Sequence, residues 1–555
     1  MTEDDTAGEM RRHSSLVAAG IGLSRLSGLI RDAALAFFLG ANIGADAFRA
    51  ALRIPNFLQN LLGEGVLSAS FIPTYSRLLD EGREPEAGRV AGAVLGLLIA
   101  LSGVLVLAGV LFARPLTVAL TPGFVGDRLD LTVALVRVMF PGIGLLVVSA
   151  WCLGVLNSHR RFFLSYVAPV LWNAGILAVL IGLGATAVLD PAVAAAWGVV
   201  LGGGLQVLVQ VRTVRELLRG TLRLSLDTRS PGVRQVLRAF GPIVLGRGVV
   251  QIAALLDLVV ASLLAVGAVA VLGYAQTLYL LPIALFGMSV AAAELPTLSR
   301  LGPGADAPAL QRRLDEGSAR SAFFVTGTTV GFVLLGQPIV ALLFGRGEFD
   351  AATTTQVAAV LAVYSLGLVP ATSSRLLQSL LYATDDAKTP AAVAVARVAL
   401  ALAIGVPLMF NLDQLVVDPT APGNVRAVTD AVSFTLTPVD AELREAADNQ
   451  LRLGAVGLAL GAAAGAWLEY LLLRRAVGRL ALSPRLGGGT MLRLLGAAAV
   501  AAVAIVPVSL LVADLNVVVR LAVPGLVGGL AYVGVCWSAR VPEARGLVDG
   551  VLRRG

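Results

Sequence analysis

The sequence predicts an all-α protein that crosses a lipid bilayer about fourteen times, with both chain ends in the cytoplasm. Of its 555 residues, 57% are hydrophobic and 14% are charged, and the mean hydropathy is +0.83. Apolar runs of about 20 residues recur from Ser15 to the C-terminus. Basic residues collect in alternate loops between these runs. Together these observations indicate a polytopic membrane protein and lie far outside the range of soluble globular domains.

The apolar runs place the predicted spans along the chain. Their centres lie near residues 27, 65, 101, 143, 174, 205, 252, 284, 332, 367, 400, 464, 501 and 528. An even number of spans puts both termini on one side of the membrane. The last two spans are poor in charge and are predicted to form an added helical pair.

Positive charge in the loops predicts the orientation, because cytoplasmic loops retain lysine and arginine. The set of loops that includes both termini holds most of the basic residues, among them seven arginines between Arg212 and Arg238. The opposite set holds only Arg114, Arg128, Arg346, Arg426, Arg444 and Arg520. The N-terminus and the C-terminus are therefore expected inside the cell. The net charge of +7 follows from this topology and from contact with anionic lipid, without a nucleic-acid partner.

Two sequence echoes predict a duplicated architecture. Residues 71–77, FIPTYSR, resemble residues 294–300, ELPTLSR, and Pro141 and Pro370 head a second matching pair of spans. We therefore expect two pseudo-symmetric six-helix bundles followed by a two-helix unit. The expected divisions are a cytoplasmic tail at 1–14, an N-terminal half at 15–225, a C-terminal half at 226–477, an extracytoplasmic insertion within it at 412–449, and the added pair with a cytoplasmic tail at 478–555.

The sequence holds no pattern for catalysis, for a metal or for a cofactor. Cys152 and Cys536 lie in apolar spans, and His13 and His159 lie in loops, so no cluster has the spacing of metal ligands. The single lysine, Lys388, lies in ATDDAKTP, which lacks the glycines of a phosphate-binding loop. We therefore expect a transporter that draws on a gradient or a partner, not an enzyme. An acidic N-terminus that leads into a full span also predicts no cleaved signal peptide.

Charged side chains interrupt the first apolar run, GLSRLSGLIRDAALAFFLG. Arg25, Arg31 and Asp32 would together cost about 8 to 10 kcal/mol if they faced lipid. Other charges within the predicted spans are Arg49, Arg53, Glu64, Arg137, Arg247, Asp257, Glu294, Arg375, Arg397 and Glu469. Such groups face a water-filled cavity, form internal ion pairs or extend from helix ends to water. We favour structural pairing for Arg137, Arg397 and Glu469, and a cavity for the charges of the first two spans.

The arginines predict an anionic ligand with an apolar body, because a guanidinium stays charged when dehydrated and binds phosphate oxygens in a bidentate fork. Arg25 and Arg31 lie about 120° apart on a straight helix, so they would converge on one ligand only if the helix bends, for which Gly28 is a plausible place. Arg49 and Arg53 share one helix face and precede Pro55, where we expect a local break.

These residues also carry a family pattern. The stretches LSRLSGLIRDAALAFFLGANIGADAF and RIPNFLQNLLGEGVLSASFIPTYSRLL resemble the N-terminal signature of the bacterial lipid II flippases, the MurJ (MviN) family of the multidrug/oligosaccharidyl-lipid/polysaccharide superfamily. The resemblance continues through TPGF, GPIVLG, LPTLSR and LLFGRGEFDAATT to DAKTP, over most of residues 15–477. It implies a V-shaped bundle in the plasma membrane with a central cationic cavity. Such a bundle moves lipid II, the lipid-linked peptidoglycan precursor, outward by alternating access.

The resemblance also implies roles for single residues. Arg25 and Arg31 match arginines that look like diphosphate ligands, and Arg375 falls where the family often has a basic residue. The acidic residues Asp46 and Glu64 match positions thought to take part in gating and ion pairing, to which we add Asp32.

The sequence departs from the family pattern at two positions. Gln59 and Thr277 stand where the family commonly has arginine. We hypothesise that Arg53 and Arg247 supply the missing charge and complete the substrate site.

Other functions remain open from the residues alone. The chain could move another polyprenyl-linked glycan, or it could be a drug or cation antiporter of the same superfamily, although the cavity of an antiporter should be acidic. It could also be an inactive scaffold that recruits cell-wall synthesis proteins through its cytoplasmic arginines. Asp257 and Glu294 could bind a coupling cation or proton, or they could neutralise Arg247. An anionic substrate and the missing nucleotide motifs favour membrane potential or an ion gradient as the driving force.

Overall fold

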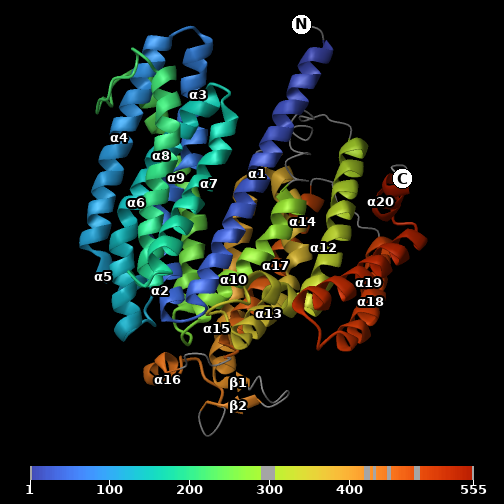
Figure 1. Ribbon diagram of the computed structural model, residues 1–555. Coiled ribbons are helices and arrows are strands. Elements are labelled where there is room, and N and C mark those ends of the chain that lie inside the picture. The colour runs from blue at the N-terminus through green and yellow to red at the C-terminus, as the bar shows by residue number, and fades with distance from the viewer. Residues whose placement is uncertain are drawn as a thin grey trace. The chain divides into compact units, whose positions relative to one another are not determined.

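Helices make up nearly all of the secondary structure in the computed structural model (Figure 1). The structure describes residues 3–288, 307–384, 386–417, 425–428, 433–446, 452–479 and 488–552. The chain divides into two compact units, Met1–Val269 and Ala270–Gly555. The echo ELPTLSR and Glu294 lie outside the described residues, so the structure does not address the predictions made for them.

The first unit contains the helices up to α9. They are α1 (Glu3–Leu39), α2 (Ile43–Leu62), α3 (Glu64–Asp80), α4 (Glu84–Leu111), α5 (Ala113–Leu120), α6 (Gly126–Ser158), α7 (Phe162–Val179) with the π-helical turn η1 (Leu180–Gly184), α8 (Pro191–Leu217) and α9 (Pro231–Ala261). Its core lies among α3, α4, α6, α8 and α9, where Tyr75 and Trp151 are buried and the Trp151 Nε1 donates to the carbonyl of Ala91 at 3.1 Å. The expected halves at 15–225 and 226–477 stay a prediction, since α9 groups with the helices before it.

The second unit continues the helical pattern. Its elements are α10 (Ala268–Pro282) with η2 (Ile283–Met288), α12 (Ala307–Phe344), α13 (Ala351–Ser365), α14 (Leu368–Ala383), α15 (Lys388–Asp413), β1 (Leu415–Val417), β2 (Val425–Ala427), α16 (Ala441–Glu445), α17 (Gly454–Gly478), α18 (Gly488–Leu511), α19 (Val517–Ser538) and α20 (Pro542–Leu552). Helices α15 and α17 pack closely, because Gly457, Gly461 and Gly465 let the α15 backbone approach.

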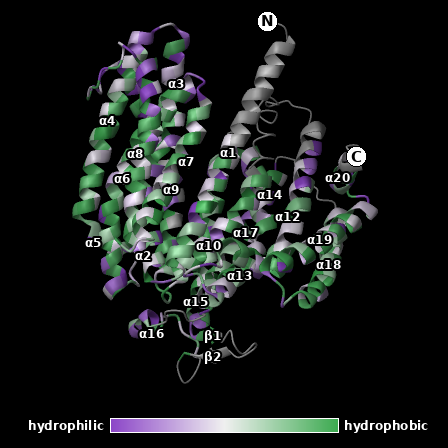
Figure 2. Cartoon of the chain, in the orientation of Figure 1, coloured by the Kyte–Doolittle hydropathy of each residue, from purple (hydrophilic) through white to green (hydrophobic). Residues whose placement is uncertain are grey.

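The C-terminal pair α18 and α19 docks on α12. The Tyr532 hydroxyl of α19 donates to the carbonyl of Phe323 in α12 at 2.7 Å. Large apolar side chains on the outer faces of the pair remain exposed, for example Leu511 and Leu530. Hydrophobic residues run along both helices in Figure 2, as expected for a surface that contacts lipid.

Ten of the described helices are long and apolar enough to cross a membrane, or eleven if the bent pair α13 and α14 forms one span. Helices α1, α2 and α9 are not among them, and they carry many of the charged residues noted above, including Arg31, Arg53 and Asp257. Each predicted centre nevertheless lies in a helix, or at Gly367 in the bend between α13 and α14. The prediction of a helical polytopic membrane protein is therefore confirmed. The number of fourteen spans stays a prediction.

One local expectation fails in the first unit. The break expected at Pro55 is wrong, because α2 continues through this buried proline and ends at Gly63. Pro55 is buried, and packing in a membrane bundle tolerates a proline inside a helix. The backbone of Gly63, by contrast, approaches the carbonyl of Gln59 too closely for a side chain. Helix α1 is continuous from Glu3 to Leu39, and the bend at Gly28 stays a prediction.

The segment between α8 and α9 follows a groove on α4. Gly88, Gly92 and Gly96 form one face of α4, and a Cβ atom at these positions would collide with Thr221, Arg223 and Ser225 respectively. This part of the arginine-rich segment between Arg212 and Arg238 therefore packs against a helix of the same unit. The glycine spacing of four residues supplies the flat face that an extended backbone needs.

We predict that Gly92→Leu destabilises the protein, because its side chain would displace the linker backbone at Arg223. Overpacking of this kind costs about 1 to 3 kcal/mol. Gly103→Leu on the same helix is the matched control, since its Cβ would meet no atom within 4 Å. A melting temperature in detergent should fall for Gly92→Leu alone, and equal melting temperatures for the two variants would contradict the groove.

Candidate functional site

Arg31 of α1 is held by a polar cluster that α7 completes. Its Nε and Nη2 donate to Asp32 Oδ1 at 3.1 and 2.8 Å, and its Nη1 donates to Asn173 Oδ1 at 3.0 Å. The Asn173 Nδ2 in turn donates to Ser27 Oγ at 2.8 Å. The guanidinium carbon lies 5.3 Å from the centre of the Trp172 ring, within the range of a cation–π contact. Helices α1 and α7 are thus joined around one cation.

This arrangement leaves Arg31 able to bind a further anion. A guanidinium has five N–H donors, and the three hydrogen bonds above use three of them. Asp32 is almost fully buried, whereas 19% of the Arg31 side chain remains accessible. Asp32, Asn173 and Trp172 fix the orientation of the Arg31 guanidinium. A ligand would therefore meet N–H donors that are already oriented.

Arg25 does not join this cluster. It lies on the same continuous helix, is exposed, and makes no hydrogen bond or ion pair with any residue that the structure describes. The structure therefore does not bring Arg25 and Arg31 to one point. The two residues are six positions apart, roughly 9 Å along the helix axis or less than two turns, and they lie on different faces of α1, so a shared ligand would have to reach around the helix.

Arg53 of α2 lines a cavity against α9. The cavity has a volume of about 250 Å³, and its lining residues are Arg53, Asn56, Phe57, Asn60, Gln251 and Leu255. Asn60 Nδ2 donates to Gln251 Oε1 at 3.0 Å and so connects the two helices. Arg247 lies on α9 one turn before Gln251. Its side chain lies outside the described part of the structure.

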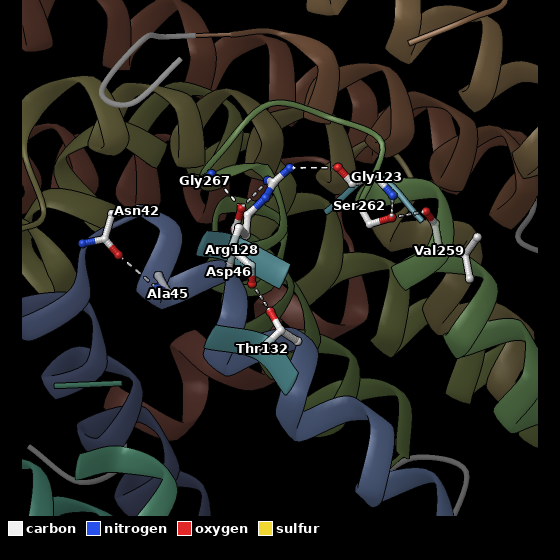
Figure 3. Close-up of polar contacts among 9 residues, drawn as sticks. All are labelled: Asn42, Ala45, Asp46, Gly123, Arg128, Thr132, Val259, Ser262 and Gly267. Carbon is white, nitrogen blue, oxygen red and sulfur yellow. Dashed lines mark hydrogen bonds and ion pairs between the residues drawn. The ribbon is translucent and has the colours of Figure 1, made fainter. Parts of the chain in front are cut away.

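Asp46 forms a fully buried ion pair with Arg128, shown in Figure 3. The Arg128 Nη1 donates to Asp46 Oδ2 at 3.1 Å, and both side chains have no accessible surface. Asp46 lies in the first turn of α2, where the helix dipole favours a carboxylate, and Asn42 caps this helix. The Phe124 ring covers the guanidinium at 4.2 Å. Two buried charges are tolerated here because each neutralises the other.

The same pair ties α2 and α6 to the segment between α9 and α10. Gly267 N donates to Asp46 Oδ2 at 2.8 Å, and Gly267 has a φ of +88°, with no room for a Cβ beside the carbonyl of Ala41. The Ser262 Oγ accepts from Gly123 N at 3.2 Å, while Arg128 Nη2 donates to the Gly123 carbonyl at 3.4 Å. One network therefore fastens three segments of the first unit (Figure 3).

The remaining predicted residues lie on α3, α14 and α9. Glu64 is exposed in the first turn of α3, directly after the interruption at Gly63. Arg375 of α14 is exposed and donates to Gln378 Oε1 at 3.3 Å. Arg375 belongs to the second unit. Asp257 lies on α9 of the first unit and is exposed.

The second unit uses its other intramembrane charges internally. Arg397 pairs with the buried Glu469 at 2.8 Å, as the structural interpretation of these residues predicts, and Gln378 donates to the same carboxylate at 2.8 Å. Of the two departures from the family pattern, Thr277 bonds within its own helix. The other, Gln59, is partly buried on α2.

Sequence reasoning missed three partners of these sites, namely Arg128, Asn173 and Gln251. Arg128 carried a signal, because it is one of the few arginines in loops that otherwise lack positive charge. Asn173 is a polar residue within an apolar run, which also marks it. Nothing in the local sequence connects either residue to its partner, which lies 82 residues away for Arg128 and 142 residues away for Asn173.

Comparisons with known proteins agree with one another. Residues 35–417 match the protein family described as lipid II flippase MurJ. A probable lipid II flippase MurJ of Bdellovibrio bacteriovorus is 31% identical over 426 residues, which cover 74% of this chain and 80% of the relative. The lipid II flippase MurJ of Burkholderia cenocepacia is 33% identical over 379 residues, covering 67% and 73% respectively.

Solved structures show the same fold. A lipid II flippase MurJ in an inward closed conformation matches with a TM-score of 0.73 and 21% identity, over 94% of this chain and 97% of that chain. An inward-facing multidrug resistance transporter of the MATE family, also in the MOP superfamily, matches with a TM-score of 0.58 and 17% identity, over 82% and 99%. The lower score of the second match places this chain's fold nearer to the first.

We predict that Arg128→Met lowers the unfolding free energy by about 3 to 5 kcal/mol, because it leaves the Asp46 carboxylate buried without its counter-charge. Combining it with Asp46→Asn should recover much of this loss. Arg114→Met is the control, since Arg114 pairs with Asp130 on the exposed surface and should contribute less than about 1 kcal/mol. Equal losses of unfolding free energy for Arg128→Met and Arg114→Met in denaturant titrations would contradict a stabilising role for the buried ion pair of Asp46 and Arg128.

Proposed function

Because this chain belongs to the lipid II flippase MurJ family, we propose that its arginines hold the diphosphate of lipid II while the lipid crosses the membrane. The chain is a lipid II flippase, a transporter and not an enzyme. It is a multi-pass protein of the bacterial inner membrane, and its role in peptidoglycan synthesis follows from its substrate.

The observation that carries the binding proposal is the orientation of Arg31. Asp32 and Asn173 hold its guanidinium, and two N–H donors remain for a ligand. A diphosphate that leaves water needs several charge-assisted donors to replace its hydration. Arg25, Arg53 and Arg247 of the first unit supply further positive charge, and Arg375 supplies it from the second.

We also assign the acidic residues to the control of transport. Asp32 neutralises Arg31 when no substrate is bound, and an arriving diphosphate takes over part of that role. The buried pair of Asp46 and Arg128 holds α2 against α6, so a change of conformation at this end has to break it. Glu64 follows the interruption at Gly63, where α2 and α3 can change their angle.

The proposed transport cycle assumes that the chain has fourteen spans and two pseudo-symmetric halves. It also assumes that both termini lie in the cytoplasm. The arginine-rich loops then lie inside, and the insertion at 412–449 lies outside. Alternating access exposes the cationic site first to the inner leaflet and then to the outer one. An inside-negative membrane potential favours the outward movement of a bound anion, which supplies a driving force without nucleotide hydrolysis.

Complementation of a flippase-depleted bacterium tests the binding proposal. Arg31→Ala removes at least two charge-assisted hydrogen bonds and should weaken lipid II binding by about 100-fold, which abolishes growth. Arg25→Ala and Arg247→Ala should reduce lipid II export, and the exposed Arg114→Ala should retain it. Full export by Arg247→Ala would contradict the compensating role of Arg247, and full export by all three variants would contradict the cationic site.

Cysteine labelling tests the proposed topology. Ser225→Cys in the linker should react with a membrane-impermeant maleimide only after the cells are opened, whereas Ala185→Cys, between η1 and α8, should react in intact cells. Both sites are exposed, and the native Cys152 and Cys536 are buried, so background labelling should be low. Labelling of Ser225→Cys from outside would overturn the orientation.

A further inference from the structure

The cavity between α2 and α9 offers chemistry that a diphosphate does not use. Only Arg53 among its six lining residues is charged, and three of the others carry side-chain amides: Asn56, Asn60 and Gln251. Phe57 and Leu255 supply apolar surface. A phosphate group alone would use only the NH2 donors of these amides and leave their carbonyl oxygens unpaired, since the oxygens of a diphosphate diester only accept hydrogen bonds.

The amides leave both donors and acceptors available. Within the part of the chain that the structure describes, the bond from Asn60 Nδ2 to Gln251 Oε1 is the one that these two side chains make. The Nε2 donors of Gln251 and the Oδ1 acceptor of Asn60 therefore remain. Asn56 Oδ1 is buried and has no hydrogen-bond partner among the described residues. A ligand that satisfies Asn56 must bring a donor, and a phosphate has none to give.

An acetamido group meets these requirements in one small unit. Its N–H can donate to the Asn56 or Asn60 oxygen, and its carbonyl can accept from Gln251 Nε2. Its methyl group can contact Phe57 and Leu255. A hydroxyl group in the same place could make a hydrogen bond but would leave the apolar walls and one amide unused.

We infer that this amide cavity binds the acetamido substituent of an N-acetylated sugar in the transported lipid. The inference rests on the proposed function, which supplies a sugar attached to a diphosphate. Two arginines lie where a diphosphate next to the sugar would need them. Arg53 lines the same cavity, and Arg247 lies one turn from Gln251 on α9. Two of the arginines assigned to the diphosphate, Arg53 and Arg247, thus lie beside the sugar site along α2 and α9, and the cavity selects N-acetylated glycolipids.

The test compares two synthetic polyprenyl-diphosphate glycolipids that differ at one position of the first sugar, acetamido or hydroxyl. Native mass spectrometry of the full-length protein in detergent measures the affinity for each. The wild type should bind the acetamido lipid about tenfold more tightly, the effect of one or two hydrogen bonds with their apolar contact. Gln251→Met and Asn56→Leu should bind both lipids with affinities within about twofold of each other.

Gln206→Met in α8 is the matched control, because Gln206 is buried in the same unit away from the cavity residues and should keep the tenfold preference. A wild type that binds both lipids equally overturns the inference, and this comparison needs no variant to fold. A preference that survives in Gln251→Met and Asn56→Leu also overturns it, as does an equal loss of both lipids, since the cavity would then serve the shared diphosphate. A wild type that binds neither lipid contradicts the proposed function instead.

Discussion

A guanidinium between packed helices is stable only where other groups hold it, and this constraint determines how α1 packs on α7 around Arg31. Asp32 supplies the opposite charge from the same helix, and Asn173 and Trp172 supply a hydrogen bond and an aromatic face from α7. These contacts stabilise the packing of α1 on α7 and orient the arginine before any ligand arrives. If the proposed function holds, stability and diphosphate binding depend on the same few atoms.

Helix α2 combines three different uses of polar residues along its length. Asp46 at its start is sealed in a neutral pair, Arg53 in its middle lines a cavity, and Gly63 ends it before the exposed Glu64. The pair resists opening because separating two buried charges is costly, while the glycine permits a change of angle at the other end. A helix that is locked at one end and interrupted at the other suits a transporter that must change its accessible side.

The sequence predicts those features that depend on composition and local pattern. Long apolar runs mark the helices, and charges within them mark Arg31 and Arg53 as unusual, whereas Asp46 is singled out only by the family resemblance. The sequence cannot predict which distant residue pairs with each charged side chain, because Arg128 and Asn173 reach their partners only when the helices pack. Packing also explains the error at Pro55, since neighbouring helices support a helix that local rules would break, and it explains why the linker follows the glycine face of α4.

Direct contact between Arg31 and the substrate diphosphate is the central claim of this account. Solid-state NMR can measure it as dipolar coupling between guanidinium ¹⁵N and ³¹P in membranes that contain arginine-labelled protein and lipid II. We expect an arginine signal that is dephased by phosphorus, at a separation of about 4 Å. Dephasing should fall in Arg31→Lys, because only the other arginines of the proposed site then remain near the phosphorus. Phosphorus dephasing that is unchanged in Arg31→Lys, or that is absent from the wild type with lipid II bound, would contradict the account.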